Sequence, residues 1–473
     1  MPKDKKQKSS AYRLIAIFAA AALILIGVFV TPPADLTTEG FRALCIMLAA
    51  IVLWVTEAIP VIITCLGLFP AFTYLGVMTT REFFAASSSS AIFFTLAGFG
   101  IGAALLKTNV SSLLLGAVLK RAKGNSKAII SGFVILTSTI SLIVANYAAI
   151  IAVVGLGVAV VKAYGDPAPG NSRLAAGIML AIPYGSMCGG IATPASNGLN
   201  VILMDLLLNL TGIEVTFLQW SMVGAPMAVI LTIFGAWCLP KIINPETLTE
   251  EQIKGFDALY ENVPEKLESK DWKFLVIVGA MIVLWIGSNW IPMLDTTRVA
   301  LLGLIVMFLP GINLITGQEY MKNCAPLGVI MLLCIMPIAT AMNQTGAGQW
   351  IADTLFSGAS NASMVGMLLM VTIAALIIHL AVPSGATNAA ICGTLMFSVA
   401  VATGIPGTAV ALILGAQCGN NFLLAYEGIY AFTYTYGHYT FKDTFKSGLP
   451  LSILQYILCV TLVPLLAMLF RLP

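Results

Sequence analysis

Residues 128–164 read AIISGFVILTSTISLIVANYAAIIAVVGLGVAVVKAY, an apolar stretch that is interrupted near its middle by Val144-Ala145-Asn146-Tyr147. Its length is about that of two membrane half-crossings, which predicts a hairpin that dips into the bilayer and returns. A second such stretch, residues 363–403, is interrupted by Pro383-Ser384-Gly385-Ala386-Thr387-Asn388. Non-helical backbone at membrane depth is tolerated only where protein or a water-filled cavity surrounds it. Two such breaks in corresponding halves of a chain indicate the binding site of a transporter.

The composition excludes an ordinary soluble domain. Of 473 residues, 59% are hydrophobic and 10% are charged, and the mean hydropathy is +0.95, whereas about 25% of the residues of a soluble domain are charged. The net charge of +3 is too small to imply a nucleic-acid partner. The two histidines and nine cysteines have no metal-binding or catalytic spacing. We therefore expect a polytopic membrane protein that is not an enzyme and carries no cofactor.

Apolar runs of membrane-spanning length define the predicted helices. The first follows a lysine-rich N-terminus and is interpreted as a retained helix, because no small-residue cleavage site precedes a soluble domain. Two shorter pieces, residues 111–123 and 349–356, are expected on the membrane surface. The predicted helices are residues 14–30, 41–56, 61–77, 88–106, 221–239, 274–290, 299–314, 326–342 and 449–470, with broken helices over residues 174–210 and 408–434.

The chain divides into two halves that follow the same plan. Residues 1–240 form the first half, residues 241–273 a polar cytoplasmic linker helix, and residues 274–473 the second half. Lys and Arg in short loops stay cytoplasmic. Residues 107–127 carry five of them, and the corresponding residues 344–362 carry none. We therefore expect an inverted repeat with about eleven full crossings and two opposed re-entrant hairpins, in the cell (inner) membrane, with the N-terminus cytoplasmic and the C-terminus outside.

Local sequence supports a duplication. Gly185-Ser186-Met187-Cys188-Gly189-Gly190 in the first broken helix corresponds to Gly415-Ala416-Gln417-Cys418-Gly419-Asn420 in the second. Small residues alone are weak evidence, since they often only let membrane helices approach. Each stretch, however, follows a hairpin, and this shared position favours duplication.

The polar residues at the breaks are candidates for ligand binding. Half-helix N-termini attract anions, and carbonyls at half-helix C-termini hold cations, so such a site needs no buried arginine. The alternative is that these side chains only cap helix ends, as Ser, Thr and Asn commonly do. The candidates are Asn146, Ser384, Thr387 and Asn388 at the hairpins and Gly189, Thr193, Ser196, Asn197 and Asn200 at the first helix break.

Three motifs resemble a known family. Trp54-Val55-Thr56-Glu57-Ala58-Ile59-Pro60 matches the W-x-[ST]-E-A-I-P signature of the divalent anion:sodium symporters, which carry dicarboxylates, citrate or sulfate. The run from Gly189 to Asn200 is similar to that family's G-G-x-A-T-x-x-G-T-x-x-N stretch. Residues 437–448 resemble its segment before the last helix. The resemblance covers nearly the whole chain, including the repeat.

The resemblance implies a homodimeric secondary active transporter in the lipid bilayer, with small anions as substrate and Na+ as the coupling ion. Symport of di- or tricarboxylates of the succinate, malate and citrate class by alternating access is the majority behaviour of the family. The candidate substrate-binding residues are Asn146, Tyr147, Ser384, Thr387, Asn388, Thr193 and Asn197, and the candidate ion-binding residues are Ala145, Asn146, Gly189, Asn200, Ala386, Asn388, Cys418 and Glu427. Of these, Tyr147 and Glu427 are candidates where the chain departs from the family pattern.

Departures from the family pattern leave the substrate open. The family's hairpin tips carry Ser-Asn-Thr, whereas this chain has Ala145-Asn146-Tyr147 and Thr387-Asn388-Ala389. Each Thr position is changed, and a site built around a hydroxyl discriminates strongly against its absence. Glu427 stands where the family has a Pro-Pro-Asn-like turn, and an acid in a membrane segment is by default a functional candidate. A sodium-independent or proton-coupled exchanger, a sulfate-type carrier and, from a different class, an ion channel therefore stay open.

Overall fold

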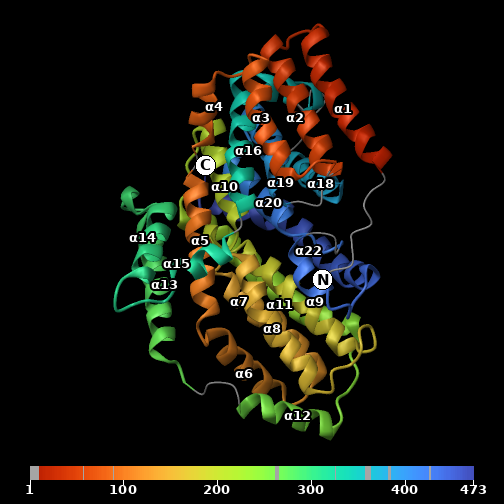
Figure 1. Ribbon diagram of the computed structural model, residues 1–473, viewed down its shortest axis with the longest axis vertical. Coiled ribbons are helices and arrows are strands. Elements are labelled where there is room, and N and C mark those ends of the chain that lie inside the picture. Colours follow the sequence, from red (N-terminus) through yellow and green to blue (C-terminus); the bar gives the residue numbers. More distant parts are fainter. Residues whose placement is uncertain are drawn as a thin grey trace. The chain divides into compact units, whose positions relative to one another are not determined.

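The computed structural model describes residues 10–56, 58–88, 90–261, 266–324, 326–356, 364–381, 385–424 and 428–472. Within these ranges every regular element is a helix (Figure 1), which confirms the predicted all-α class. The helices form two compact units built from separate stretches of chain. Unit 1 is Met1–Ile92, Ile202–Glu214 and Ala325–Ala411, and unit 2 is Phe93–Val201, Val215–Cys324 and Leu412–Pro473.

Unit 1 packs its N-terminal helices against α16, from the second half of the chain. α16 contacts α2, α3 and α4, and its residue Met342 joins Trp54, Phe72 and Phe83 in one buried apolar core. The second predicted hairpin lies in this unit as α18 and α19, which contact each other. The helices of unit 1 are α1 (Ser10–Phe29), α2 (Thr38–Thr56), α3 (Val61–Tyr74), α4 (Thr80–Ser87), most of α10 (Gly198–Thr211), α16 (Pro326–Gln344), α17 (Ala347–Phe356), α18 (Met364–Ala381) and α19 (Gly385–Thr403).

Unit 2 is built around α9. Every residue of α9 from Leu174 to Gly190 is buried, as expected of a helix that is apolar on all sides and surrounded by others. α7, α8, α11 and α21 all contact it, and α7, α8, α9 and α11 lie side by side in Figure 1. The helices of unit 2 are α5 (Ser90–Leu106), α6 (Val110–Ala122), α7 (Ser126–Ser141), α8 (Asn146–Ala163), α9 (Arg173–Gly190), α11 (Phe217–Ile243), α12 (Glu250–Glu261), α13 (Ser269–Gly287), α14 (Thr296–Phe308), α15 (Gly317–Asn323), the end of α20 (Gly407–Gly419), α21 (Gly428–Tyr434) and α22 (Phe441–Leu469).

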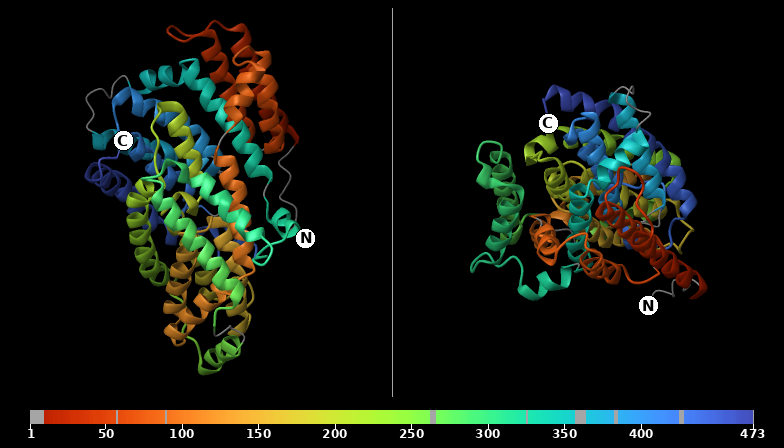
Figure 2. Two further views of the ribbon diagram at one scale, coloured as in Figure 1. Left: turned by 90° about the vertical axis from the view of Figure 1, so that its left-hand side faces the viewer. Right: turned by 90° about the horizontal axis from the view of Figure 1, so that it is seen from above.

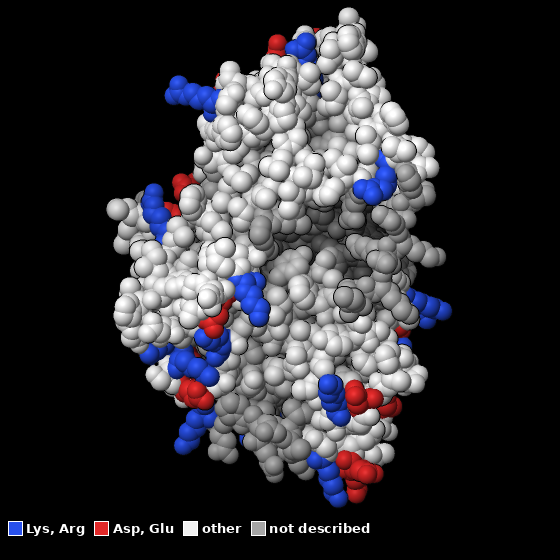
Figure 3. Space-filling model, in the orientation of Figure 1, with Lys and Arg blue, Asp and Glu red and all other residues white. Residues whose placement is uncertain are grey.

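The polar linker folds as α12 at one end of unit 2. α12 contacts α8. In the left view of Figure 2, α12 lies at the lower end of this unit. Gly255 of α12 lies against the carbonyl of Ala163 at the end of α8, so closely that a Cβ there would clash. Acidic and basic side chains gather at this end (Figure 3), as expected for the part of the chain with the most mixed charges.

Four described helices are long and apolar enough to cross a membrane: α1, α8, α11 and α22, with a fifth span if α4 and α5 are counted as one broken crossing. Shorter apolar helices, α7, α10 and α14 among them, accompany these. Because α8 by itself has the length of a crossing, the re-entrant geometry and the number of crossings stay predictions.

Several helices begin at capping residues, which are polar and therefore cannot be predicted from a run of apolar residues. The last helix was expected at residue 449, but α22 begins at Phe441 because Thr440 and Asp443 form a capping box. Asp443 also pairs with Arg173 at the start of α9, with Nη1 and Oδ1 2.8 Å apart. The short helices α4 and α15 were not predicted, and both start with a capping box.

Candidate functional site

The helix break after α9 is closed by the residues that follow it. α9 ends at Gly190, and Thr193 then caps a short 3₁₀ turn that has Pro194 at its first position. Proline cannot continue an α-helix, because it lacks the N–H group and its ring clashes with the preceding turn. The chain therefore stops, turns and restarts as α10, which places non-helical backbone in the interior of unit 2.

Asn200 and Ser196 satisfy the carbonyls that this break exposes. Nδ2 of Asn200 donates to the carbonyls of Gly190 and Thr193, at 2.9 Å each. The hydroxyl of Ser196 donates to Gly190 at 2.7 Å. Oδ1 of Asn200 is buried and has no hydrogen-bond partner among the described residues. Asn200 thus holds the break closed and leaves one buried acceptor oxygen unused.

The first hairpin is tied to α9 by hydroxyl groups on both sides of its tip. The hydroxyl of Ser141, at the end of α7, donates to the carbonyl of Ser186 at 3.0 Å. Ser186 in turn donates to the carbonyl of Asn146 at 2.9 Å, and Thr193 donates to that of Leu142 at 3.0 Å. These bonds fix the hairpin tip, residues 142–146, against the end of α9.

Glycines of the duplicated motif bring α7 and α9 into backbone contact. A Cβ on Gly185 would meet the carbonyl oxygen of Val134, and one on Gly189 would meet that of Ser138. Helices approach this closely only where side chains are absent. Gly189, predicted as an ion-binding position, therefore has a packing role in this structure.

Asn146 lies where one helix begins and another ends. It is the first residue of α8, its exposed fraction is 3%, and a Cβ on Gly190 would lie 3.1 Å from its Nδ2 atom. The N-cap of α8 is Ala145, which has no side-chain acceptor for the first-turn N–H groups. The positive end of α8 and the negative end of α9 thus lie together, an arrangement that suits an anion beside a cation.

The end of α20 lies against Asn197 and Asn200. A Cβ on Gly415 would lie 3.1 Å from Oδ1 of Asn200, and one on Gly419 would lie 2.7 Å from Nδ2 of Asn197. Cys418, predicted as an ion-binding residue, is fully buried between these glycines in sequence. Within unit 2 the structure therefore brings together the ends of α8, α9 and α20, with their amide side chains.

Tyr147 is the exposed residue of the tip. Its exposed fraction is 48%, and its ring packs edge-on against Phe432 of α21 with centroids 6.0 Å apart. A Cβ on Gly428 would lie 3.2 Å from the Tyr147 hydroxyl oxygen. Tyr147 thus faces the start of α21 and is open on its other side.

In unit 1, Asn388 is fully buried in the first turn of α19. Its Oδ1 accepts from the thiol of Cys392 at 3.1 Å, and its Nδ2 has no partner among the described residues. His379, near the end of α18, is also buried. Ser384, Glu427 and Glu57 lie outside the described residues, as do the side chains of Ala386 and Thr387.

Charge is nearly absent from the buried interior. Among the described residues, Asp271 is the only Asp, Glu, Lys or Arg that is buried. It accepts from the backbone N–H groups of Asn109 and Glu268 at 2.8 Å each, which ties α13 to the start of α6. Neutral amides, hydroxyls and backbone groups therefore provide the polarity at the α9 break.

Asp205 is a residue that the sequence interpretation missed. It lies in α10 and binds the start of α5 within unit 1, with Oδ1 2.9 Å from the Ser90 hydroxyl and Oδ2 3.0 Å from the backbone nitrogen of Ala91. The signal was present, because Asp205 is the only acid in the apolar run 174–210 and acids in membrane segments are functional candidates by default.

A family model, the sodium:sulfate symporter transmembrane region, matches residues 9–471. The chain belongs to this symporter family. It is therefore a membrane transporter and not an enzyme. The closed α9 break and the Ala145-Asn146-Tyr147 tip described above are thus features of one of its members.

Curated relatives of this symporter are distant but cover most of the chain. A protein described as "Membrane protein" from Cupriavidus necator is 23% identical over 467 residues, covering 93% of this chain and 90% of its own length. The sodium-dependent dicarboxylate transporter SdcS of Staphylococcus saprophyticus is 23% identical over 377 residues, covering 74% and 72%.

Two solved structures share the fold of this symporter. The MtrF structure from Neisseria gonorrhoeae, described as illuminating a class of antimetabolite efflux pumps, has a TM-score of 0.60 at 12% identity and covers 98% of this chain and 96% of its own. The YdaH transporter of Alcanivorax borkumensis has a TM-score of 0.54 at 14% identity, covering 98% and 99%. At these identities the likeness concerns the transporter fold alone.

Proposed function

We propose that the protein is a secondary active transporter that couples the movement of small di- or tricarboxylate anions to sodium ions. The family description names sodium and an anion, and the printed name of the SdcS relatives names sodium and dicarboxylates. Both support the proposal at the level of substrate class.

The observation that carries the proposal is the meeting of the α8 N-terminus with the α9 C-terminus at Asn146 and Gly190. An anion needs N–H donors and a positive dipole end, and these belong to the start of α8. A sodium ion needs oxygen ligands, and Oδ1 of Asn200 is a buried acceptor oxygen without a partner among the described residues. Asn146, Thr193, Asn197 and Tyr147 are the substrate-side residues of this proposal.

The experiment is uptake of labelled anions into proteoliposomes. Succinate, malate, citrate, tartrate and sulfate are each tested with an inward sodium gradient, with a proton gradient and with internal unlabelled anion. We expect saturable uptake of at least one carboxylate that requires sodium. Asn146→Ala should abolish it, whereas Asn171→Ala, which changes an exposed asparagine of the loop before α9, should leave it unchanged.

Other outcomes distinguish the alternatives. Uptake driven by internal anion without sodium indicates an exchanger, and uptake that follows the proton gradient indicates proton coupling. Preference for sulfate would replace the carboxylate assignment. Current without saturation would indicate a channel, and no uptake of any anion under any condition contradicts the transport proposal.

The altered hairpin tip favours one second candidate. Ala145 has no hydroxyl, and Tyr147 carries its hydroxyl at the far end of a ring, so ions and substrates that depend on the Ser and Thr hydroxyls of the family's tip lose those ligands. A sodium-independent carboxylate exchanger is therefore the alternative that the panel is designed to detect.

Assembly and orientation belong to the same proposal. We expect a homodimer in the inner membrane with the N-terminus cytoplasmic. Light scattering of the purified protein measures the dimer. Labelling of single cysteines placed at residue 123 and residue 345 from either side of the membrane tests the opposed orientation of the two halves.

A further inference from the structure

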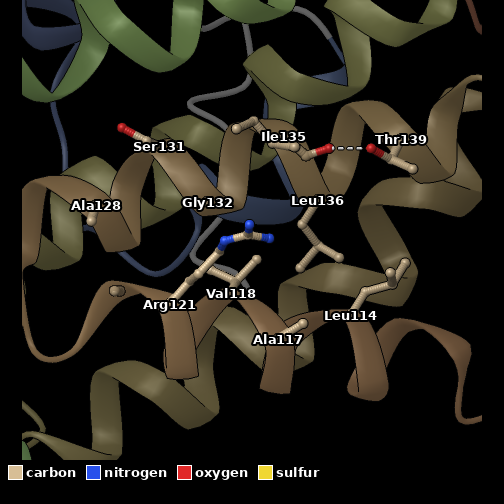
Figure 4. A pocket seen from close by; sticks show the side chains of 11 residues that line it. Leu114, Ala117, Val118, Arg121, Ala128, Ser131, Gly132, Ile135, Leu136 and Thr139 are labelled. Atoms are coloured by element: carbon tan, nitrogen blue, oxygen red, sulfur yellow. Dashed lines mark hydrogen bonds between the residues drawn. The ribbon is translucent and has the colours of Figure 1, made fainter.

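The structure contains a cavity of about 700 Å³ away from the helix breaks, between α6 and α7. Figure 4 shows it as a groove between the two helices. Its lining residues are Leu114, Ala117, Val118, Arg121 and Ala122 from α6 and Ala128, Ser131, Gly132, Ile135, Leu136 and Thr139 from α7.

The walls of this α6–α7 groove are apolar and open to the surroundings of the helices. Leu114 and Val118 are half-buried, Ala117 is exposed, and the exposed fraction of Ile135 is 48%. The two helices touch at Gly132, where Val118 occupies the space that a Cβ would fill. In a membrane-spanning protein such a surface is covered by lipid chains, because an exposed apolar slot is not left to water.

One charged side chain enters this groove. Figure 4 shows Arg121 rising from α6 toward α7, beside Val118. Arg121 makes no ion pair with any residue that the structure describes. A guanidinium presents a planar fork of donors that matches phosphate oxygens, so it is incompletely used at this position.

Further positive charge lies at the same end. Lys120 and Lys123 flank Arg121, and Lys127 is in the first turn of α7. All three are exposed, and like Arg121 they make no ion pair within the described part of the chain. Cations suit the C-terminus of a helix such as α6. That preference accounts for these charges and for Arg121, but not for the apolar walls that Arg121 borders.

We propose that the α6–α7 groove binds an anionic phospholipid, with the phosphate on Arg121 and part of one acyl chain along Leu114, Val118 and Ile135. Bilayer chains would fill the groove in any case, and they are as apolar as its walls. Selection among lipids therefore depends on the headgroup, where each basic residue near the surface favours an anionic lipid. Under the predicted orientation this groove faces the inner leaflet.

The test measures binding of a fluorescent phosphatidylglycerol to the full-length protein in uncharged detergent micelles. Phosphatidylcholine with the same chains and glycerol 3-phosphate serve as competitors. Phosphatidylglycerol should bind more tightly than phosphatidylcholine, and Arg121→Gln should weaken it about fivefold, the size expected for one basic residue near a lipid surface. Arg121→Lys should bind more tightly than Arg121→Gln and more weakly than the unmodified protein, because it keeps the charge and loses the planar fork. Ala117→Phe, which fills the groove and leaves the charge, should also weaken binding.

Lys241→Gln is the matched control, because Lys241 is a basic residue of α11 that lies over the ring of Trp237 and not in the groove. An equal loss in Arg121→Gln and Lys241→Gln would mean attraction by the general positive charge and would overturn the proposal. Competition by glycerol 3-phosphate as effective as by the lipid would identify a soluble phosphate as the occupant. A change of oligomeric mass in Ala117→Phe would assign the groove to a second copy of the chain, and unchanged binding in every variant would reject the site.

Discussion

Nδ2 of Asn200 lies 2.9 Å from the carbonyl oxygen of Gly190, ten residues earlier in the chain. The same nitrogen also donates to the carbonyl of Thr193, so one side chain provides hydrogen bonds to two carbonyl groups of the helix break. This relationship gives the break a fixed geometry through hydrogen bonds of a neutral amide. It also makes Asn200 a position where folding and the proposed ion binding meet.

Replacement of Asn200 by alanine should destabilise the protein. The change leaves the carbonyls of Gly190 and Thr193 without their amide donor, and a buried unsatisfied group costs about 1–3 kcal/mol. Thermal unfolding in detergent measures the loss, and Asn171→Ala is the control on an exposed asparagine. Equal melting temperatures for the two variants would contradict the role assigned to Asn200.

Gly189→Ala should be more damaging than another glycine substitution in the same unit. Its Cβ would meet the backbone carbonyl of Ser138, which cannot move without separating α7 from α9. Gly155, on α8, has nothing within 4 Å of its Cβ position. Gly155→Ala should therefore be neutral or stabilising by up to about 1 kcal/mol, since alanine is the better helix former. The yield of monodisperse protein and its melting temperature report both effects, and the reverse order would refute the close packing.

Asp205→Ala should loosen the start of α5. It removes the acceptor for the Ser90 hydroxyl and the Ala91 backbone N–H, a loss of about 1 kcal/mol for a helix-start acceptor. Asp205→Asn keeps an acceptor oxygen and should retain most of the stability. Hydrogen exchange of the first turn of α5 measures the difference. Identical protection in the two variants would show that the carboxylate does not hold this helix start.

His438, in the loop before α22, predicts a pH dependence of stability. Burial lowers the pKa of His438 below its ordinary value, and the nearby charge of Asp166 only partly opposes this. The folded protein therefore binds protons more weakly at this site than the unfolded chain, whose histidine titrates near pH 6.5. Stability should rise as the pH is raised through the folded and then the unfolded pKa, and be lost as the pH falls below about 6.5.

The measurement is the melting temperature between pH 5 and pH 8 for the unmodified protein and for His438→Gln. The variant should show the smaller change over this interval. A pH dependence that is the same in both proteins would assign it to other groups.

Tyr147→Phe and Tyr147→Ala should change uptake without changing stability. The side chain is half exposed at the hairpin tip, and surface substitutions usually alter stability by less than about 0.5 kcal/mol. If the hydroxyl is a ligand donor, Tyr147→Phe raises the half-saturating anion concentration. If only the ring shapes the site, Tyr147→Ala alone changes the order of preference among the anions. Unchanged kinetics in both variants would remove Tyr147 from the proposed site.

Much of the fold was predictable because membrane helices are defined by apolar length. α2, α9 and α16 begin within three residues of the predicted positions. The break between α7 and α8 lies between Ser141 and Asn146 and overlaps the predicted residues 144–147. Hydropathy does not predict a helix that begins with polar residues, such as α22, because a capping box depends on two side chains. The division into two units was not predictable, because it depends on contacts between stretches far apart in the chain.

The helix break after α9 was predictable in its location, whereas the contacts of its side chains were not. The Gly, Pro and Asn signals at 189–200 identified the break, because these residues cannot continue or do not favour a helix. The sequence did not indicate that Asn200 would bond backward to Gly190, or that Gly189 would lie against Ser138, since both depend on three-dimensional contacts. The sequence also did not indicate that Asp205 would bind Ser90 and Ala91, which lie more than a hundred residues earlier in the chain.

Asn146 and Tyr147 are neighbours in the chain but lie in different surroundings. Asn146 is enclosed by the end of α9, whereas Tyr147 is open on one side. A lineage can therefore sample new side chains at residue 147 while the fold survives each trial. Under the proposed function, single substitutions at residue 147 can change which anion the transporter prefers without loss of the fold.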